Sequence, residues 1–174
     1  NIITIYDYGC TEDGLCFMVM ERLHGRNLAT ILQHEKNLSL GRSLHLVVQV
    51  AGAVAEAHQG GVIHRDLKPE NIHIHSMHVG PEFAKVLDFG IAKIVHGEQG
   101  PLGGGSQTAA GAIFGTPQYM SPEQVHGHAI DHRSDVYSLG IILFELLTGS
   151  PPFADCSPVG AMLAHISKPL PDLK

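Results

Sequence analysis

The feature that most limits the possible folds is a polar segment at residues 64–71 that directly follows a long helical pattern. The segment reads His-Arg-Asp-Leu-Lys-Pro-Glu-Asn, and Gly60-Gly61 separates it from the apolar pattern that precedes it. Apolar side chains before the glycines recur at helical spacing. They predict one long helix with an apolar face formed by Leu44, Val47, Val48, Ala51, Val54 and Ala55.

The composition is that of one globular domain or most of one. The 174 residues are 44% hydrophobic and 16% charged, which excludes a disordered chain. Lys and Arg number 11 against 17 Asp and Glu, and the net charge is −6. Because a nucleic-acid surface needs a basic footprint, we expect no nucleic-acid partner.

The three cysteines, Cys10, Cys16 and Cys156, are scattered and form no C-x-x-C pair. We therefore expect neither a disulfide framework nor a zinc site, and a reducing, cytoplasmic setting. The longest apolar stretch, residues 136–147, is much shorter than the roughly 20 residues that span a bilayer, so it predicts a buried helix and no membrane segment. The chain starts at Asn1 without a signal peptide, from which we expect a piece of a longer protein.

Short strands and one short helix are expected around the polar segment. Alternation over residues 1–9 and an apolar run at residues 15–20 predict two antiparallel strands. A short helix is expected at residues 28–32, and further strands at residues 72–75 and 85–87.

The second half of the chain predicts a loop followed by helices. Residues 97–115 are rich in glycine and predict a long loop. Either Ser134 or Asp131 is expected to cap an apolar helix that stops at Gly149, and Ser157 to open one more helix. No internal repeat and no second domain boundary is visible.

Two further motifs follow the polar segment in a fixed order. Asp88-Phe-Gly90 begins 17 residues after Asn71, and residues 115–123 read Gly-Thr-Pro-Gln-Tyr-Met-Ser-Pro-Glu. Together the three motifs resemble the catalytic core of protein kinases. Residues 85–93 and 107–110 are similar to the bacterial, eukaryotic-like (Hanks-type) serine/threonine kinases.

The resemblance implies an α+β, protein-kinase-like fold made mainly of the helical C-lobe. Residues 1–23 would be the last N-lobe strands and the hinge, and residues 24–174 the C-lobe. Within the C-lobe, residues 64–71 would be the catalytic loop and residues 88–123 the activation segment. We expect the domain to be truncated at both ends.

The resemblance also assigns catalytic roles. Asp66 would accept or orient the proton of the substrate hydroxyl, and Lys68 would steady charge on the γ-phosphate of ATP. Asn71 and Asp88 would hold Mg²⁺ with the hard oxygen ligands that this cation prefers. Lys68 together with Thr116 is the pattern of serine/threonine kinases, so we expect protein substrates with Ser or Thr acceptors. A pseudokinase scaffold and a small-molecule phosphotransferase are the alternatives.

Nucleotide contacts follow from the same resemblance. Met20 would be the gatekeeper, Glu21 and Leu23 would offer backbone groups to adenine, and Asn27 would reach the ribose. His73 stands where the family places an aliphatic side chain under adenine, so nucleotide affinity is expected to fall when this imidazole is protonated near pH 6 to 6.5. The full expected ATP-binding set is Met20, Glu21, Leu23, Asn27, Lys68, Glu70, Asn71, His73 and Asp88.

Regulation by phosphorylation is expected from Arg65, which precedes the catalytic Asp. Its guanidinium would pair with a phosphate on Thr108, or on Ser106 as second candidate, although both hydroxyls also fit an ordinary loop. Glu123 is expected to pair with an Arg beyond this chain, and Asp135 to brace the backbone of the catalytic loop.

Two histidine groups and the missing first half of the domain complete the expectations. Residues 73–78 and 126–132 each contain three histidines, for which solvation is the default and a transition metal the alternative. The glycine-rich loop, the strand Lys and the helix Glu of the family are absent, so this piece alone is expected to be inactive. The resemblance leaves open a membrane anchor and a homodimer formed through the parent chain.

Overall fold

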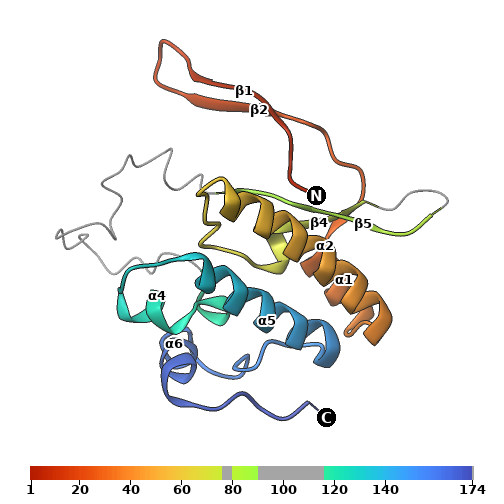
Figure 1. Cartoon of the computed structure of the whole chain (residues 1–174), viewed down its shortest axis with the longest axis vertical. Coiled ribbons are helices and arrows are strands. Elements are labelled where there is room, and N and C mark those ends of the chain that lie inside the picture. Colours follow the sequence, from red (N-terminus) through yellow and green to blue (C-terminus); the bar gives the residue numbers. More distant parts are fainter. Residues whose placement is uncertain (76–79, 90–115, 174) are drawn as a thin grey trace.

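A computed structural model describes residues 1–75, 80–89 and 116–173. Figure 1 shows a two-stranded hairpin that lies apart from a helical body, with a small sheet between them. The secondary structure elements, in chain order, are β1 (Ile5–Cys10), β2 (Cys16–Met20), β3 (Arg26–Asn27), α1 (Leu28–Glu35), α2 (Leu40–Gln59), the 3₁₀ turn η1 (Pro69–Asn71), β4 (Ile72–His75), β5 (Phe83–Val86), the 3₁₀ turn η2 (Pro117–Tyr119), α4 (Pro122–His126), α5 (His132–Thr148) and α6 (Pro158–Ser167). The α+β class expected from the resemblance is confirmed.

The two sheets are antiparallel. Strands β1 and β2 pair from Ile5 opposite Met20 to Cys10 opposite Cys16, as the alternating pattern predicts. Strand β4 pairs with β3 on one side and with β5 on the other. The chain start is attached to this second sheet, because Ile3 donates its backbone N–H to the carbonyl of Val86 at 3.0 Å.

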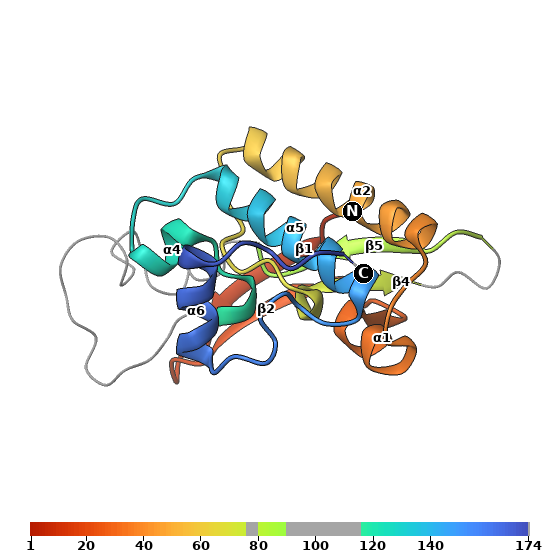
Figure 2. The same cartoon turned by 90° about the horizontal axis from the view of Figure 1, so that it is seen from below.

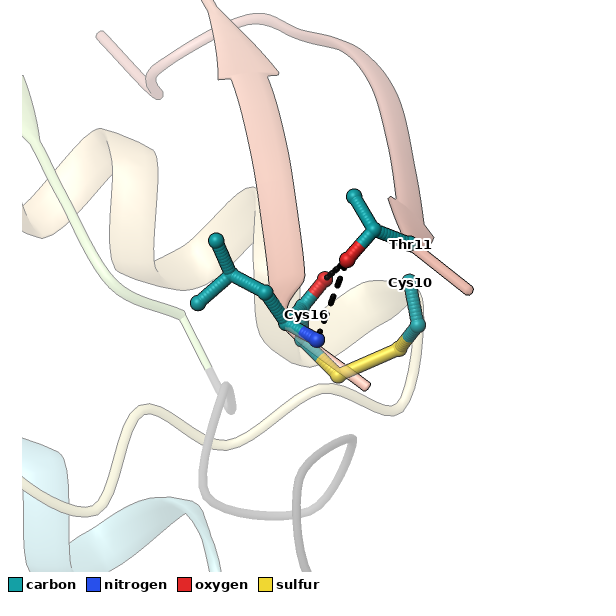
Figure 3. Close-up of a disulfide and its surroundings, with 4 residues drawn as sticks. Cys10, Thr11 and Cys16 are labelled. Atoms are coloured by element: carbon teal, nitrogen blue, oxygen red, sulfur yellow. Dashed lines mark hydrogen bonds between the residues drawn. A yellow bond between two sulfur atoms is a disulfide. The ribbon is translucent and has the colours of Figure 1, made fainter. Parts of the chain in front are cut away.

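Cys10 and Cys16 form a disulfide at the end of the β1–β2 ladder (Figure 3). The expectation that the chain has no disulfide was therefore wrong. The hairpin register brings the two residues directly opposite each other. Beside the disulfide, Thr11 Oγ1 accepts a hydrogen bond from Leu15 N at 3.1 Å and donates to Leu15 O at 3.2 Å, which closes the turn.

Helices α2 and α5 form the centre of the helical body, and α6 lies on the side of α5 opposite α2 (Figure 2). The long helix at α2 is confirmed, but its expected apolar face is wrong in part. Leu44 and Val48 are exposed, whereas Leu46 and Val50 are buried. Both sides of α2 carry apolar residues, and the contacts with α5 and β5 decide which side faces the core.

The ends of α5 and α6 follow the local signals in the sequence. Of the two candidate caps of α5, Asp131 is the one that accepts a hydrogen bond, from Arg133 N at 2.9 Å. The helix ends at Gly149, whose φ of 88° lies in the left-handed region that glycine adopts without strain. Ser157 caps α6 by accepting from Gly160 N at 3.1 Å.

Two separate clusters of buried apolar residues stabilise the body. The larger one includes Leu46, Ile72, Val86 and Leu146, all fully buried between the helices and the second sheet. The smaller one consists of Phe153 and two residues of α6, Ala161 and Ala164. Within residues 1–75, 80–89 and 116–173, no helix combines the length and the apolar character that crossing a bilayer requires.

Candidate active site

Three residues expected to act in catalysis lie in direct contact. Lys68 Nζ is 2.7 Å from Asp66 Oδ2 and donates to Thr116 Oγ1 at 3.0 Å. Asp66 and Lys68 belong to the loop between α2 and η1, whereas Thr116 immediately precedes η2. One cation therefore joins a partly exposed carboxylate to a hydroxyl 48 residues away.

Asn71 connects this loop to the segment that carries Asp88. The side-chain nitrogen of Asn71 donates a hydrogen bond to the backbone carbonyl of Asp66 at 2.9 Å. The backbone carbonyl of Asn71 accepts one from Leu87 N at 2.8 Å. Asp88 is exposed and has a φ of 61°. Because the amide nitrogen of Asn71 is already engaged, its side-chain oxygen is the atom left for a ligand.

His64 makes a second connection between the same two segments. Its Nε2 lies 2.8 Å from the carbonyl of Leu87, and its Nδ1 lies 3.3 Å from the backbone N of Asp66. Since a carbonyl can only accept, the neutral ring must carry its proton on Nε2. Burial lowers the pKa of His64, opposed by the hydrogen bond to Leu87 and by the nearby charges of Asp135, Asp66 and Asp88.

Asp135 at the start of α5 supports the backbone of the expected catalytic loop, residues 64–71, as predicted. It is 1% exposed, and its two oxygens accept from His64 N at 2.8 Å and Arg65 N at 2.9 Å. These bonds hold Arg65 at a φ of 70°, which is unfavourable for a residue with a side chain. His58 is a third partner that the sequence reasoning missed: its Nε2 lies 2.7 Å from Asp135 Oδ2.

Glu123 contacts a different residue of α5. Its carboxylate accepts a hydrogen bond from the hydroxyl of Ser134. Ser134 therefore does not cap α5, because its side chain is used to hold α4 against the helix start. The expected pairing of Glu123 with an Arg stays a prediction.

The expected hinge contains an ion pair that the sequence reasoning did not include. Glu21 and Lys85 are paired, and Glu21 Oε1 also accepts from Thr4 N at 2.8 Å. Bonding to Lys85, and then to Thr4, lowers the pKa of Glu21 to about 2. Met20 is 42% exposed and Leu23 half-buried, and their expected contacts with adenine stay predictions.

Asn27 and His73 pair with each other across β3 and β4. Asn27 caps α1 by accepting from Thr30 N at 2.8 Å, a structural role that explains the residue without a ribose. His73 Nδ1 is buried without a hydrogen-bond partner among the described residues, and burial followed by the neighbouring His75 lowers its pKa. The contacts of both residues with ATP stay predictions.

Two of the remaining candidates lie in the described residues and are exposed to solvent. Arg65 and Glu70 have exposed side chains. Gly90, Ser106 and Thr108 lie outside the described residues, so the expected phosphosites stay predictions.

The structure describes the second histidine group in full and the first in part. His126 and His128 stack with ring centroids 5.1 Å apart, and His132 instead lies 5.8 Å from His58. His78 lies outside the described residues. In the part of the chain that the structure covers, no three His, Cys, Asp or Glu side chains are grouped closely enough to hold a metal ion.

Comparison with known proteins agrees with this arrangement. The protein kinase domain family matches residues 1–168. The chain is 48% identical over 172 residues to "Serine/threonine-protein kinase pkn3" of Myxococcus xanthus, covering 98% of this chain and 31% of that protein. It is 40% identical over 174 residues to "Serine/threonine-protein kinase PknB" of Mycobacterium tuberculosis, covering 98% of this chain and 26% of that protein.

The chain spans less than a third of the length of these curated relatives. The family match nevertheless covers nearly all of the chain, including the loop with Asp66, the segment with Asp88 and the turn after Thr116. The chain belongs to the protein kinase domain family.

Proposed function

We propose that the protein is a serine/threonine kinase that transfers the γ-phosphoryl group of ATP to hydroxyl groups of protein substrates. The observation that carries the proposal is the position of Lys68, between the carboxylate of Asp66 and the hydroxyl of Thr116. Asp66 orients the incoming hydroxyl and receives its proton, while Lys68 faces the negative charge of the transferred group. A carboxylate and a cation 2.7 Å apart suit a reaction that moves a proton and an anionic group in opposite directions.

Two oxygen ligands for Mg²⁺ are proposed, one on Asn71 and one on Asp88, which follows Leu87, the residue bonded to Asn71. Asn71 and Asp88 supply an amide oxygen and a carboxylate, which are the ligand types that Mg²⁺ prefers. The bond from Asn71 to the carbonyl of Asp66 fixes the amide, and its oxygen accepts no hydrogen bond from the described residues. Magnesium with ATP supplies charge neutralisation on the phosphates, and the chain supplies the fixed positions of these ligands.

Ser and Thr acceptors are favoured by the contact between Lys68 and Thr116, and by the printed names of the relatives. The remaining nucleotide contacts are proposed at Met20, Glu21 and Leu23. Support for this placement comes from the pair between Glu21 and Lys85, which fixes the backbone of the expected hinge against β5.

Regulation and setting form a second part of the proposal. Arg65 is exposed, and its guanidinium is available to a phosphate on Thr108 or Ser106. We place the domain in the cytoplasm, with any membrane anchor or dimer contact in other parts of the protein. Because a reducing cytoplasm would open an exposed disulfide, alkylation of Cys10 and Cys16 in protein isolated from its cells tests the setting.

The experiment measures transfer of labelled phosphate from ATP by the complete protein, with Ser, Thr and Tyr peptides and a set of small alcohols as acceptors. We expect labelling of Ser and Thr peptides alone. Asp66→Asn and Asp88→Asn should each lower turnover by about a hundredfold or more, since they remove the base or a metal ligand. Asp155→Asn is the matched control, because Asp155 is exposed and has no part in the network.

Three results would contradict the proposal. Labelling of small alcohols without labelling of peptides would make the protein a metabolite phosphotransferase. Binding of ATP without any transfer would make it a scaffold. Unchanged turnover in Asp66→Asn would remove the assigned role of the carboxylate.

A further inference from the structure

His165 in α6 is a buried titratable side chain that the proposed reaction does not use. It is 5% exposed, although α6 also presents Val159 and Leu163 to solvent. The ring lies edge-on to Phe153, with centroids 5.0 Å apart, and edge-on to Tyr137 of α5. A histidine placed so deeply needs partners for both ring nitrogens.

Both nitrogens have partners, and these partners fix the protonation pattern of the ring. Nε2 lies 3.0 Å from the carbonyl of Gln118 in η2, and Nδ1 lies 2.8 Å from the hydroxyl of Tyr137. The carbonyl can only accept, so Nε2 donates and Nδ1 of the neutral ring accepts from Tyr137. Burial lowers the pKa of His165, opposed by the carbonyls of Gln118 and Pro117, and so favours this neutral form.

This histidine connects parts of the molecule that share no apolar core. Phe153 belongs to the small cluster under α6, whereas Tyr137 packs against the large central cluster. The polar bridge through His165 therefore connects α6 and its small cluster to η2, whose Tyr119 belongs to the large cluster. The next residue of η2 is held from α5, because Ser138 Oγ donates a hydrogen bond to the carbonyl of Tyr119 at 2.8 Å.

The turn held in this way lies beside the proposed acceptor site. Tyr119 N donates to the carbonyl of Thr116 at 3.0 Å, and the hydroxyl of Thr116 contacts Lys68. Lys68 in turn contacts Asp66. An extended peptide advances about 3.3 Å per residue, so a substrate with its hydroxyl at Asp66 has its neighbouring residues within reach of η2.

We propose that His165 is a positioning residue for the peptide substrate, which acts by holding η2 through the carbonyl of Gln118. The inference rests on the proposed kinase function and adds to it a residue more than forty positions from η2 in sequence. Among the described residues, the hydrogen-bond partners of His165 are Tyr137 and Gln118, and neither belongs to residues 64–71 or to the proposed ATP-binding set. Its loss should therefore weaken peptide recognition and leave ATP recognition intact.

The test compares His165→Leu, His165→Gln and the exposed-residue control His34→Leu in the complete protein. The Leu variant fills the space without a donor, whereas the Gln amide can donate to Gln118 in place of Nε2. We expect His165→Leu to raise the KM for a Ser peptide by about five- to tenfold, the effect of one lost hydrogen bond. The KM for ATP and kcat should stay within about twofold, and His165→Gln should recover most of the peptide KM.

Other outcomes decide against the inference. An unchanged peptide KM in His165→Leu overturns it, and so does an equal rise in both KM values without recovery by Gln, which would indicate a general structural role. If His165→Leu fails to fold, His165→Met removes the same donor to Gln118 with a more flexible apolar side chain. An unaltered peptide KM in that variant also overturns the inference. A wild-type protein that transfers no phosphate would refute the proposed function itself.

Discussion

Replacing Asp135 by Asn tests how far one buried carboxylate stabilises the catalytic loop. The side chain keeps its size, so no cavity forms, but one of its two oxygens becomes an N–H donor. In the wild type both oxygens accept from buried or half-buried donors: the backbone N–H groups of His64 and Arg65, and the ring of His58. An amide at this position can accept from only one of the two backbone groups.

The expected loss of stability follows from counting these bonds. If the amide oxygen keeps the bond to Arg65, the bond falls from charge-assisted to neutral, a loss of about 1 kcal/mol. His64 N–H is then buried without an acceptor, which costs about 1–3 kcal/mol. His58 can adapt by accepting from the new amide. The free energy of unfolding should therefore fall by about 2–4 kcal/mol, a large part of the ~5–15 kcal/mol typical of a domain.

The assay is urea denaturation of the complete protein. Unfolding is followed by far-UV circular dichroism, and phosphate transfer is measured in parallel. With a slope of about 2 kcal/mol per molar urea, the midpoint should fall by about 1–2 M. Turnover should fall even where the variant is folded, because the loop that carries Asp66 loses the bond from His64 N–H to Asp135. Asp131→Asn is the control, since it lies at the start of the same helix and Asn caps equally well. A midpoint within 0.2 M of wild type, roughly the precision of the method, would refute the reasoning.

Three further predictions concern pH, redox state and one glycine. Burial lowers the folded-state pKa of His64 and His165, so the unfolded chain binds protons before the folded one as the pH falls. The free energy of unfolding should therefore be constant above about pH 6.5 and decrease below it. Urea midpoints that are unchanged from pH 7.5 to 5.5 would contradict this prediction. Reducing the disulfide between Cys10 and Cys16 should lower stability by at most about 2 kcal/mol, because the loop spans only 6 residues, and calorimetry with and without a reductant measures the change. Gly25→Ala should unfold β3 or displace it, because the added Cβ would lie 2.1 Å from a backbone oxygen at a φ of 139°; a melting temperature equal to that of wild type would exclude such a clash.

The sequence by itself predicted most helices and strands of this protein. Their signals are local: Ser157 before a proline, Gly149 after an apolar run, and alternation over the first strand. Local signals depend on neighbours in the chain, so they can be recognised before the fold is known. The order of the motifs containing Asp66 and Asp88 likewise gave the family.

Tertiary structure decided which distant groups meet. The contact of His58 with Asp135 joins residues 77 positions apart, and nothing near either residue predicts the other. The pair between Glu21 and Lys85 and the bridge through His165 are of the same kind.

The same reason explains the two structural predictions that were wrong. Leu44 and Val48 have helical spacing, but α2 turns its other side to α5 and β5, where Leu46 and Val50 bury more apolar surface. Cysteine spacing cannot reveal a hairpin register, which sets Cys10 opposite Cys16. Local chemistry therefore determined where the elements begin and end, and packing between elements determined which faces are buried and which side chains become partners, because burial and pairing depend on residues that are adjacent only after folding.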